Sequence, residues 1–250
     1  MSKGIALITG AGSGIGQACA IALAREGWET VLTGRRVDAL EATITMAGSA
    51  GSAMSAITCD VTDPASVKAL FDEITKTHGR LDLVFNNAGS FGQAGNFGDL
   101  TFENWRSVVG VNLDGAFLIA NAAFKMMRDQ KPQGGRIINN GSISAHVPRP
   151  GTAAYTSSKH AITGMTKSIS LDGRAFNIAC SQIDVGNAAS AMTEAMQKGI
   201  LQADGSIRPE PVMDVSNVAS AVVYMASLSL EANVQFMTVM ATSMPFIGRG

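Results

Sequence analysis

The sequence predicts one doubly wound α/β domain over residues 1–250, built on a parallel sheet of about seven strands. Short β-branched runs alternate with amphipathic stretches along the whole chain, which is typical of repeated strand–helix–strand units. Segments such as Leu81–Phe85 are apolar throughout, as expected for strands of a sheet that is covered on both faces. We find no linker, repeat or low-complexity segment that would divide the chain.

The elements follow in order from these patterns. The predicted strands are Ile5–Thr9, Thr30–Thr33, Ala53–Cys59, Leu81–Asn86, Arg136–Asn140, Asn177–Ile183 and Val234–Met240. The predicted helices are Gly14–Glu26, Val37–Met46, Asp63–His78, Phe102–Arg128, Thr152–Arg174, Asn187–Ile200 and Asp214–Leu228. Each helix carries apolar residues three and four positions apart, and Pro64 stands at a favoured first helical position.

The composition excludes several classes of protein. Glycine supplies 27 of 250 residues, about 11%, where roughly 7% is usual, yet without a Gly-X-Y period. Charged residues make up only 16%, and 46% of residues are hydrophobic, so the chain is not disordered. A formal net charge of −1 gives no basic footprint for nucleic acid or an anionic membrane.

The cysteines and histidines indicate neither disulfides nor a metal. Three scattered cysteines fit no disulfide framework or zinc site, which favours a reducing, cytoplasmic location. The three histidines show no metal-binding spacing, so no metal is expected. The N-terminal apolar run is too short for a signal peptide, and no stretch reaches about 18 uninterrupted apolar residues, so no membrane span is expected.

A glycine-rich turn follows the first predicted strand and opens the first helix. Residues 9–16 read Thr-Gly-Ala-Gly-Ser-Gly-Ile-Gly. Glycines let backbone N–H groups approach a pyrophosphate, and the helix N-terminus adds partial positive charge. No lysine follows, so the turn is not a nucleoside-triphosphate loop. The context favours a Rossmann-type dinucleotide site over a merely flexible turn.

The end of the second strand indicates which dinucleotide binds. An acidic residue that holds the ribose hydroxyl of NAD is expected there, but residues 33–36 read Thr-Gly-Arg-Arg. The guanidiniums of Arg35 and Arg36 could hold a 2′-phosphate, so we expect NADP(H), with NAD(H) possible. The alternative is that both arginines are solvated or stack on adenine.

One helix carries the predicted proton-transfer group. Tyr155 and Lys159 lie four residues apart, on one helix face. A nearby ammonium favours tyrosinate, so we expect Lys159 to lower the pKa of Tyr155 and make it a general acid or base. Ser142 follows the fifth strand, at the same sheet edge, where its hydroxyl could donate to a developing oxyanion.

Together these residues resemble the short, single-domain branch of the short-chain dehydrogenase/reductase superfamily. The resemblance covers nearly the whole chain. It rests on residues 9–16, Asp60, Asn86-Asn87-Ala88-Gly89, Asn112, Ser142 and the pair Tyr155 and Lys159, in that order. It implies hydride transfer between a nicotinamide and a carbonyl or secondary alcohol of ketone, 3-oxoacyl or polyol type, and commonly a homotetramer.

The resemblance also implies residue roles. Tyr155 would be the acid or base, Ser142 would orient the carbonyl, and Lys159 would bind the nicotinamide ribose. Asn112 would hold a relay water, and Asp60 would contact adenine. The cofactor site would comprise Gly10, Ser13, Gly14, Ile15, Gly16, Arg35, Arg36, Asp60, Val61, Asn87, Ala88, Gly89, Tyr155, Lys159, Gly186 and Ser190. The substrate site would comprise Ser142, Ser144, His146, Tyr155 and Met192.

Two departures from the family pattern lie near the substrate side. Val185-Gly186 replaces the usual Pro-Gly after the sixth strand, and residues 238–242 replace the usual Asp-Gly-Gly. The resemblance implies that the segment 187–213 closes as a lid over the substrate. Its methionines favour a partly apolar substrate, or they are plain helix core. His146 could line the substrate pocket; the alternative is that it is a loop histidine whose hydrogen bonds are satisfied locally.

Two further interpretations remain open. The chain could be a non-catalytic dinucleotide-binding sensor or regulatory protein, although the complete set of catalytic residue types argues against this. An epimerase or dehydratase can share the Tyr–Lys pair, but it usually carries a longer C-terminal domain. The low charge favours a homotetramer, or a homodimer, that buries Phe102–Met127 and the helix after Tyr155 against a second copy.

Overall fold

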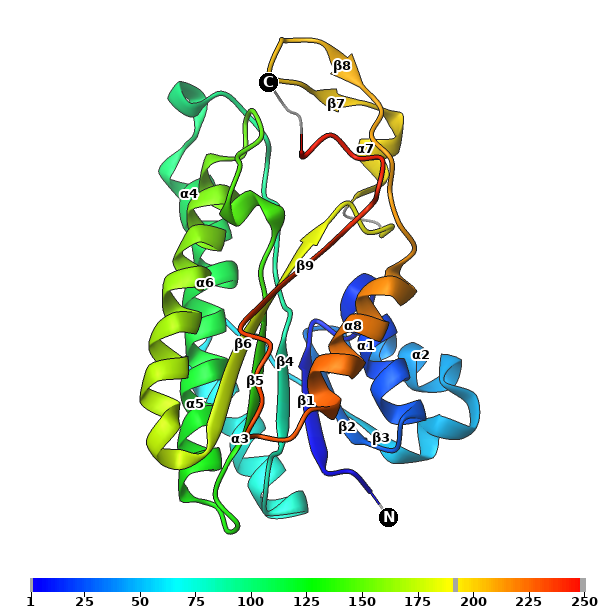
Figure 1. Cartoon of the computed structure of the whole chain (residues 1–250), viewed down its shortest axis with the longest axis vertical. Helices are drawn as coiled ribbons and strands as arrows, with labels where there is room; N and C mark the ends of the chain where they lie inside the picture. The colour runs from blue at the N-terminus through cyan, green and yellow to red at the C-terminus, as the bar shows by residue number, and fades with distance from the viewer. Residues whose placement is uncertain (1, 191–192, 248–250) are drawn as a thin grey trace.

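A computed structural model describes residues 2–190 and 193–247, and within them seven parallel strands form one sheet (Figure 1). The strand order is β3-β2-β1-β4-β5-β6-β9. The chain first adds β2 and β3 on one side of β1 and then adds β4, β5, β6 and β9 on the other side. The prediction of a doubly wound parallel sheet is therefore confirmed. The strands are β1 (Ile5–Thr9), β2 (Glu29–Gly34), β3 (Met54–Thr58), β4 (Leu83–Asn86), β5 (Gly135–Asn140), β6 (Ile178–Gly186) and β9 (Phe236–Met240).

Helices cover both faces of the sheet. One face holds α1 (Gly14–Arg25), α2 (Val37–Met46) and α8 (Val215–Ser227). The other holds α3 (Pro64–His78), α4 (Phe102–Val109), α5 (Ala116–Asp129) and α6 (Ala153–Asp172). As the sequence predicts, α3 begins with Pro64, and the Ala65 backbone N–H donates to the Asp63 carboxylate at 2.9 Å.

Successive apolar residues of each strand face opposite layers. In β1, Ala6 and Ile8 belong to the core under α1 and α8, whereas Ile5 and Leu7 belong to the core under α3 and α5. Because strand side chains alternate, a strand with helices on both sides must be apolar at every position. This arrangement explains why these strands show no polar alternation in the sequence.

The long apolar helix around residues 102–129 is continuous but not uniform. A π-helical turn, η3 (Gly110–Gly115), joins α4 to α5 and carries Asn112. By length and composition alone, Phe102–Asp129 could cross a membrane. Its inner face packs on the sheet through residues such as Ile119 and Met127, as the core helix of an α/β domain does.

The predicted helix Asn187–Ile200 is wrong for most of its length. Among the described residues of this stretch, 187–190 and 193–200, only α7 (Glu194–Lys198) is α-helical, and β7 (Ile200–Leu201) then pairs antiparallel with β8 (Ile207–Arg208). Gly199 has φ +135, which ends the helix and turns the chain into this hairpin. The other elements agree with the prediction except for shifts of a few residues at their ends.

Candidate active site

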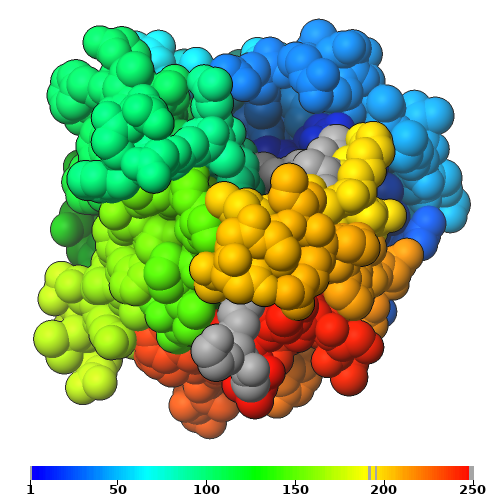
Figure 2. Space-filling view, turned by 90° about the horizontal axis from the view of Figure 1, so that it is seen from above, coloured from blue at the N-terminus to red at the C-terminus, as the bar shows by residue number. Residues whose placement is uncertain are grey.

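A cleft of about 610 Å³ lies at the carboxyl ends of the strands, where parallel sheets bind their ligands. From above this edge, the surface is hollowed between the N-terminal part, in blue, and the yellow to orange part of the chain (Figure 2). The cleft contains most of the predicted site residues, namely Gly10, Ser13, Gly14, Ile15, Arg35, Arg36, Asp60, Val61, Asn87, Ala88, Gly89, Ser142, Ser144, Tyr155, Lys159, Gly186 and Ser190.

Three predicted site residues among the described ones do not line the cleft, namely Gly16, Asn112 and His146. Asn112 instead contacts the lining residue Ser90. Met192 falls outside the described residues. Within the described residues, no group of three or more His, Cys, Asp or Glu side chains could hold a metal ion.

The glycine turn has the shape that a pyrophosphate requires. Gly10 and Gly14 have φ of +66 and +55, a conformation that favours glycine. A Cβ on Gly16 would overlap the carbonyl oxygen of Gly10, so only glycine fits where helix and turn meet. Ser13 precedes α1 without a side-chain cap, which leaves the first helical N–H groups for a ligand. These features fit a dinucleotide.

Hydrogen bonds join the glycine turn to the loop after β4. The Thr9 hydroxyl accepts the backbone N–H groups of Asn87 and Ala88, each at 2.8 Å. The Asn87 side chain in turn donates to the Thr9 carbonyl at 2.9 Å. The sequence pattern indicated no separate role for Thr9, but its hydroxyl fixes the spacing between two walls of the cleft.

The end of the cleft beside β2 and β3 carries two exposed arginines and one carboxylate. Arg35 and Arg36 follow β2 and line the cleft. Asp60 faces them from the loop after β3. Hydrogen bonds from Thr62, at 3.0 and 2.7 Å, hold the pKa of Asp60 below its usual value, and Arg35 adds a smaller effect in the same direction.

Tyr155 and Lys159 share one buried face of α6, as predicted. The Lys159 Nζ donates to the Asn140 carbonyl at 2.7 Å and lies 5.6 Å from the centre of the Tyr155 ring. Burial lowers the pKa of Lys159 to about 8, while the charge of Asp184 opposes this change.

The expected lowering of the Tyr155 pKa is not found. Burial raises the pKa of Tyr155 above its usual value, although a hydrogen bond with Ser142 and the charge of Arg149 act in the opposite direction. The reason is that removing the phenol from water disfavours the phenolate more than its polar neighbours favour it. Lys159 is directed at a carbonyl and does not offset the loss.

Asn112 supports the site from the π-helical turn. Its side chain accepts the Ser90 N–H at 2.7 Å and donates to the Ser90 carbonyl at 2.9 Å. It also donates to the Ser158 hydroxyl at 3.2 Å, next to Lys159 on α6. In the structure it braces the loop after β4 against α6, and the predicted relay role stays a prediction.

The sequence missed three features of the substrate side. Phe91 stacks on Tyr155, with ring centres 4.2 Å apart. Arg149 forms a buried ion pair with Glu210 at 2.7 Å. His146, which the sequence left without a carboxylate partner, lies 2.9 Å from the carboxylate of Asp184. Each pair joins residues far apart in the chain, so no short sequence motif could have predicted it.

Comparisons with known proteins agree with this fold. Residues 4–200 match the family described as short chain dehydrogenase. A 3beta-hydroxysteroid dehydrogenase of Mediterraneibacter gnavus is 37% identical over 190 residues, covering 76% of this chain and 68% of the relative. A cyclohexanol dehydrogenase of Acinetobacter sp. is 34% identical over 173 residues, covering 67% and 66%.

A solved structure also superposes over nearly the whole chain. A variant of actinorhodin polyketide ketoreductase with NADPH matches with a TM-score of 0.88 and 26% identity, covering 98% of this chain and 100% of that one. The chain therefore belongs to the short-chain dehydrogenase family of NAD(P)-dependent oxidoreductases, which act on CH–OH groups.

Proposed function

We propose that the chain is an NADP(H)-dependent carbonyl reductase or secondary-alcohol dehydrogenase in which Tyr155 moves the proton. The observation that carries this proposal is the convergence of Tyr155, Ser142 and Lys159 in the cleft that also holds the glycine turn. A bound nicotinamide would supply or accept the hydride. The chain has to bind both molecules, orient the carbonyl and transfer one proton.

The proposed roles follow from chemistry and position. The Ser142 hydroxyl, hydrogen-bonded with Tyr155, is placed to polarise the carbonyl oxygen that the Tyr155 hydroxyl protonates. Lys159 contributes a buried amine beside the phenol. The stacked Phe91 ring covers one face of Tyr155, which orients the hydroxyl and excludes water from that face.

The preference for NADP(H) rests on Arg35 and Arg36. Both border the cleft at the end of β2, and residues 33–36 contain no carboxylate that would hold an NAD ribose. The similar ketoreductase structure contains NADPH. We expect NADPH to bind more tightly than NADH. Comparable dissociation constants for the two would contradict this preference.

The substrate side of the cleft favours a partly apolar ketone or alcohol. Phe91, Ile143, Val185 and Met196 line it. Two relatives are named for alicyclic alcohols, a 3beta-hydroxysteroid and cyclohexanol. An assay panel therefore needs alicyclic ketones, with 3-oxoacyl thioesters and polyols beside them.

The chain offers a matched pair of variants to test the proposal, because it has only two tyrosines. Tyr155→Phe should abolish NADPH-dependent reduction while retaining NADPH binding. Tyr224→Phe, which changes a half-exposed residue of α8, should leave both unchanged. Turnover that survives in Tyr155→Phe would refute the assigned acid. A wild-type chain that binds NADPH tightly but reduces nothing in the panel would favour a sensor instead.

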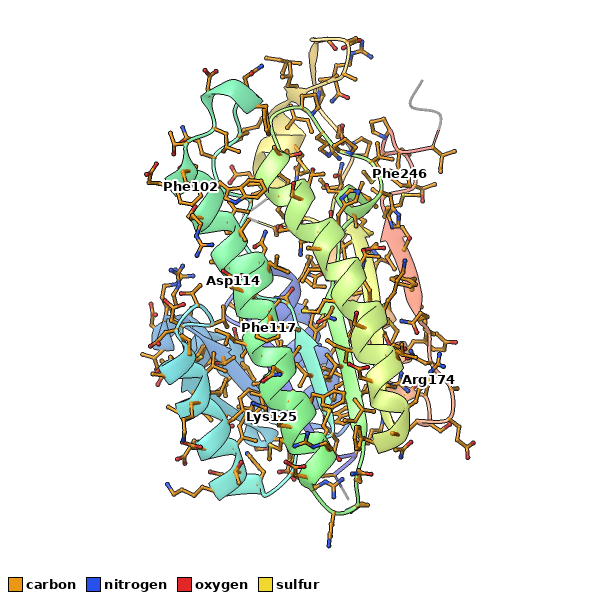
Figure 3. The ribbon with its side chains drawn as sticks, turned by 90° about the vertical axis from the view of Figure 1, so that its left-hand side faces the viewer. Phe102, Asp114, Phe117, Lys125, Arg174 and Phe246 are labelled. Atoms are coloured by element: carbon orange, nitrogen blue, oxygen red, sulfur yellow. The ribbon has the colours of Figure 1, made fainter. Side chains whose placement is uncertain are left out.

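We further propose a cytoplasmic homotetramer, or a homodimer. The three cysteines are free and buried, which suits a reducing compartment. The outer face of the α4–α5 helix displays Phe102 and Phe117 beside charged Asp114 and Lys125 (Figure 3). A second copy packed there would cover the two rings. A monomeric mass in solution scattering would contradict this assembly.

A further inference from the structure

Asp184 is a buried carboxylate at the end of β6, immediately behind the proposed catalytic groups. Its side chain is 1% exposed. One oxygen, Oδ1, accepts the backbone N–H of Ser142 at 3.0 Å and the side-chain amide of Gln182 at 2.7 Å. The other oxygen lies 2.9 Å from His146 Nε2. A carboxylate this deep needs such donors, because burying an unpaired charge is costly.

The neighbouring strand is shaped to receive this carboxylate. A Cβ on Gly141 would overlap Asp184 Oδ1 and come within 2.7 Å of Gln182 Nε2. Gly141 does not have a positive φ, so glycine is needed here because a side chain would not fit, and not because of the backbone conformation. The carboxylate of Asp184 thus occupies the place of a side chain at position 141.

The contacts of Asp184 lead directly to the reacting groups. It holds the backbone amide of Ser142, whose own hydroxyl is hydrogen-bonded with Tyr155. Its charge raises the pKa of Tyr155 and opposes the fall in the pKa of Lys159. In both cases the charge of Asp184 acts to raise the pKa, since a negative charge favours the protonated form of each neighbour.

The other charges around Tyr155 come from three further elements. Arg149, in the loop after η4 (Ile143–Ala145), acts on Tyr155 in the opposite direction, but it is paired with Glu210. Lys159 comes from α6. His146 closes the outer side of Asp184 with a ring that is 47% exposed.

We propose that Asp184 is a positioning residue of this active site: its carboxylate anchors the Ser142 amide and places a buried negative charge behind the proposed catalytic groups. His146 and Gln182 hold the carboxylate in place. The proposal rests on the proposed function in one respect, the assignment of proton transfer to Tyr155. Because reduction consumes one proton, a charge that raises the pKa of Tyr155 extends to higher pH the range in which the phenol still carries that proton.

The test is a direct titration of Tyr155. In a Tyr224→Phe background, Tyr155 is the sole tyrosine, so tyrosinate absorbance reports its ionisation alone. Asp184→Asn in that background should ionise at a pH lower by about half a unit or more, because a nearby negative charge is gone. Asp82→Asn is the matched control. Asp82 also accepts a backbone N–H, from Ile5 at 2.8 Å, but at the opposite edge of the sheet, so no shift is expected.

A second variant covers the case in which Asp184→Asn does not fold. Asp184→Ala removes the carboxylate without placing a new group beside Gln182, and Tyr155 should again ionise at lower pH. Circular dichroism and NADPH binding identify the folded variant. A folded variant whose Tyr155 titrates together with the parent would overturn the proposal.

The pH profile of kcat/KM supplies a second readout. For carbonyl reduction, the alkaline limb should move to lower pH in Asp184→Asn, since the phenol loses its proton earlier. A role limited to packing would lower kcat/KM without moving this limb. The titration needs no turnover, so failure of this inference stays distinct from failure of the proposed reaction, which Tyr155→Phe tests.

Discussion

The buried ion pair between Arg149 and Glu210 should hold the segment 187–213 on the body of the protein. Their side chains are 7% and 1% exposed, and Arg149 Nη1 lies 2.7 Å from Glu210 Oε2. Asn187 bridges the pair, accepting from Arg149 and donating to Glu210, each at 2.8 Å. Gln202 donates to the other Glu210 oxygen at 3.1 Å. Arg149→Ala is therefore the sharpest perturbation of this segment.

The expected loss follows from burial. Removing one partner of a buried pair leaves the other charge in the interior, which costs about 3–5 kcal/mol of the free energy of unfolding. This is a large share of a typical total of roughly 5–15 kcal/mol. Replacing both partners in Arg149→Met/Glu210→Leu should cost much less, because no buried charge then remains.

The destabilisation caused by Arg149→Ala should depend on pH, and its direction follows from the pKa of Glu210. Burial alone would raise the pKa of Glu210, but hydrogen bonds from Asn187, Arg149 and Gln202 bring it below the usual value of 4.5. A carboxyl group with a lowered folded-state pKa stabilises the fold above its unfolded pKa. That stabilisation is lost as the pH falls through the folded value. The difference between wild type and Arg149→Ala should therefore shrink in acid.

Urea unfolding at neutral and acidic pH measures both effects. Arg208→Ala is the control, because Arg208 forms a solvent-exposed ion pair with Asp204, and exposed pairs contribute little to stability. A loss below about 1 kcal/mol for Arg149→Ala at neutral pH, where about 3 is expected, would refute the reasoning. An equal loss in the double variant would refute it too.

Three other predictions concern the cofactor site and the core. Gly16→Ala should weaken NADPH binding at least about tenfold, since the added methyl would meet the Gly10 carbonyl; fluorescence titration measures this. Arg35→Ala/Arg36→Ala should weaken NADPH binding by about the same factor and leave NADH binding unchanged, as parallel titrations would show. Gln130→Met should lower the free energy of unfolding in urea by about 2–3 kcal/mol. The Gln130 side-chain amide accepts the Leu81 N–H at 2.9 Å and donates to the Leu81 carbonyl at 3.0 Å, and both groups would lose these partners. Unchanged stability in that variant would mean that water replaces the amide.

The sheet could be predicted because its causes are local. Each residue of β1 faces one of two apolar layers, so the whole strand is apolar and visible in the sequence. The helix start at Asp63 and Pro64 is equally local, because cap and helix lie within three residues. The region 187–200 failed for the opposite reason. Its helical spacing is real, but Asn187 has a φ of +37, and Asn187 and Ala189 form backbone hydrogen bonds with Met213 in place of a helical turn. At the other end, Gly199 and the pairing of Ile200 with Arg208 end the helix.

In the candidate site, too, the residues that are close in sequence could be predicted, and the contacts between distant residues could not. Tyr155 and Lys159 lie within one helical turn, and the glycine turn is contiguous, so both could be found in the sequence. The contact of His146 with Asp184 joins residues 38 positions apart, through strand order alone. The same holds for Arg149 and Glu210. The Tyr155 pKa could not be predicted either, because its direction depends on burial that only the assembled fold creates.

The two departures from the family pattern are one change in three dimensions. Val185 and Gly186 pair in register with Val239 and Met240 of β9, so the altered segments are neighbours in the sheet. A Cβ on Gly186 would come within 2.8 Å of both Met240 Cβ and Met244 Sδ. Without proline at 185 the strand continues to Gly186, and the glycine that the family pattern shares at 186 leaves room for the two methionines in and after the altered segment 238–242. Substrate preference should therefore follow these two segments together, so exchanging one alone should damage packing before it changes specificity.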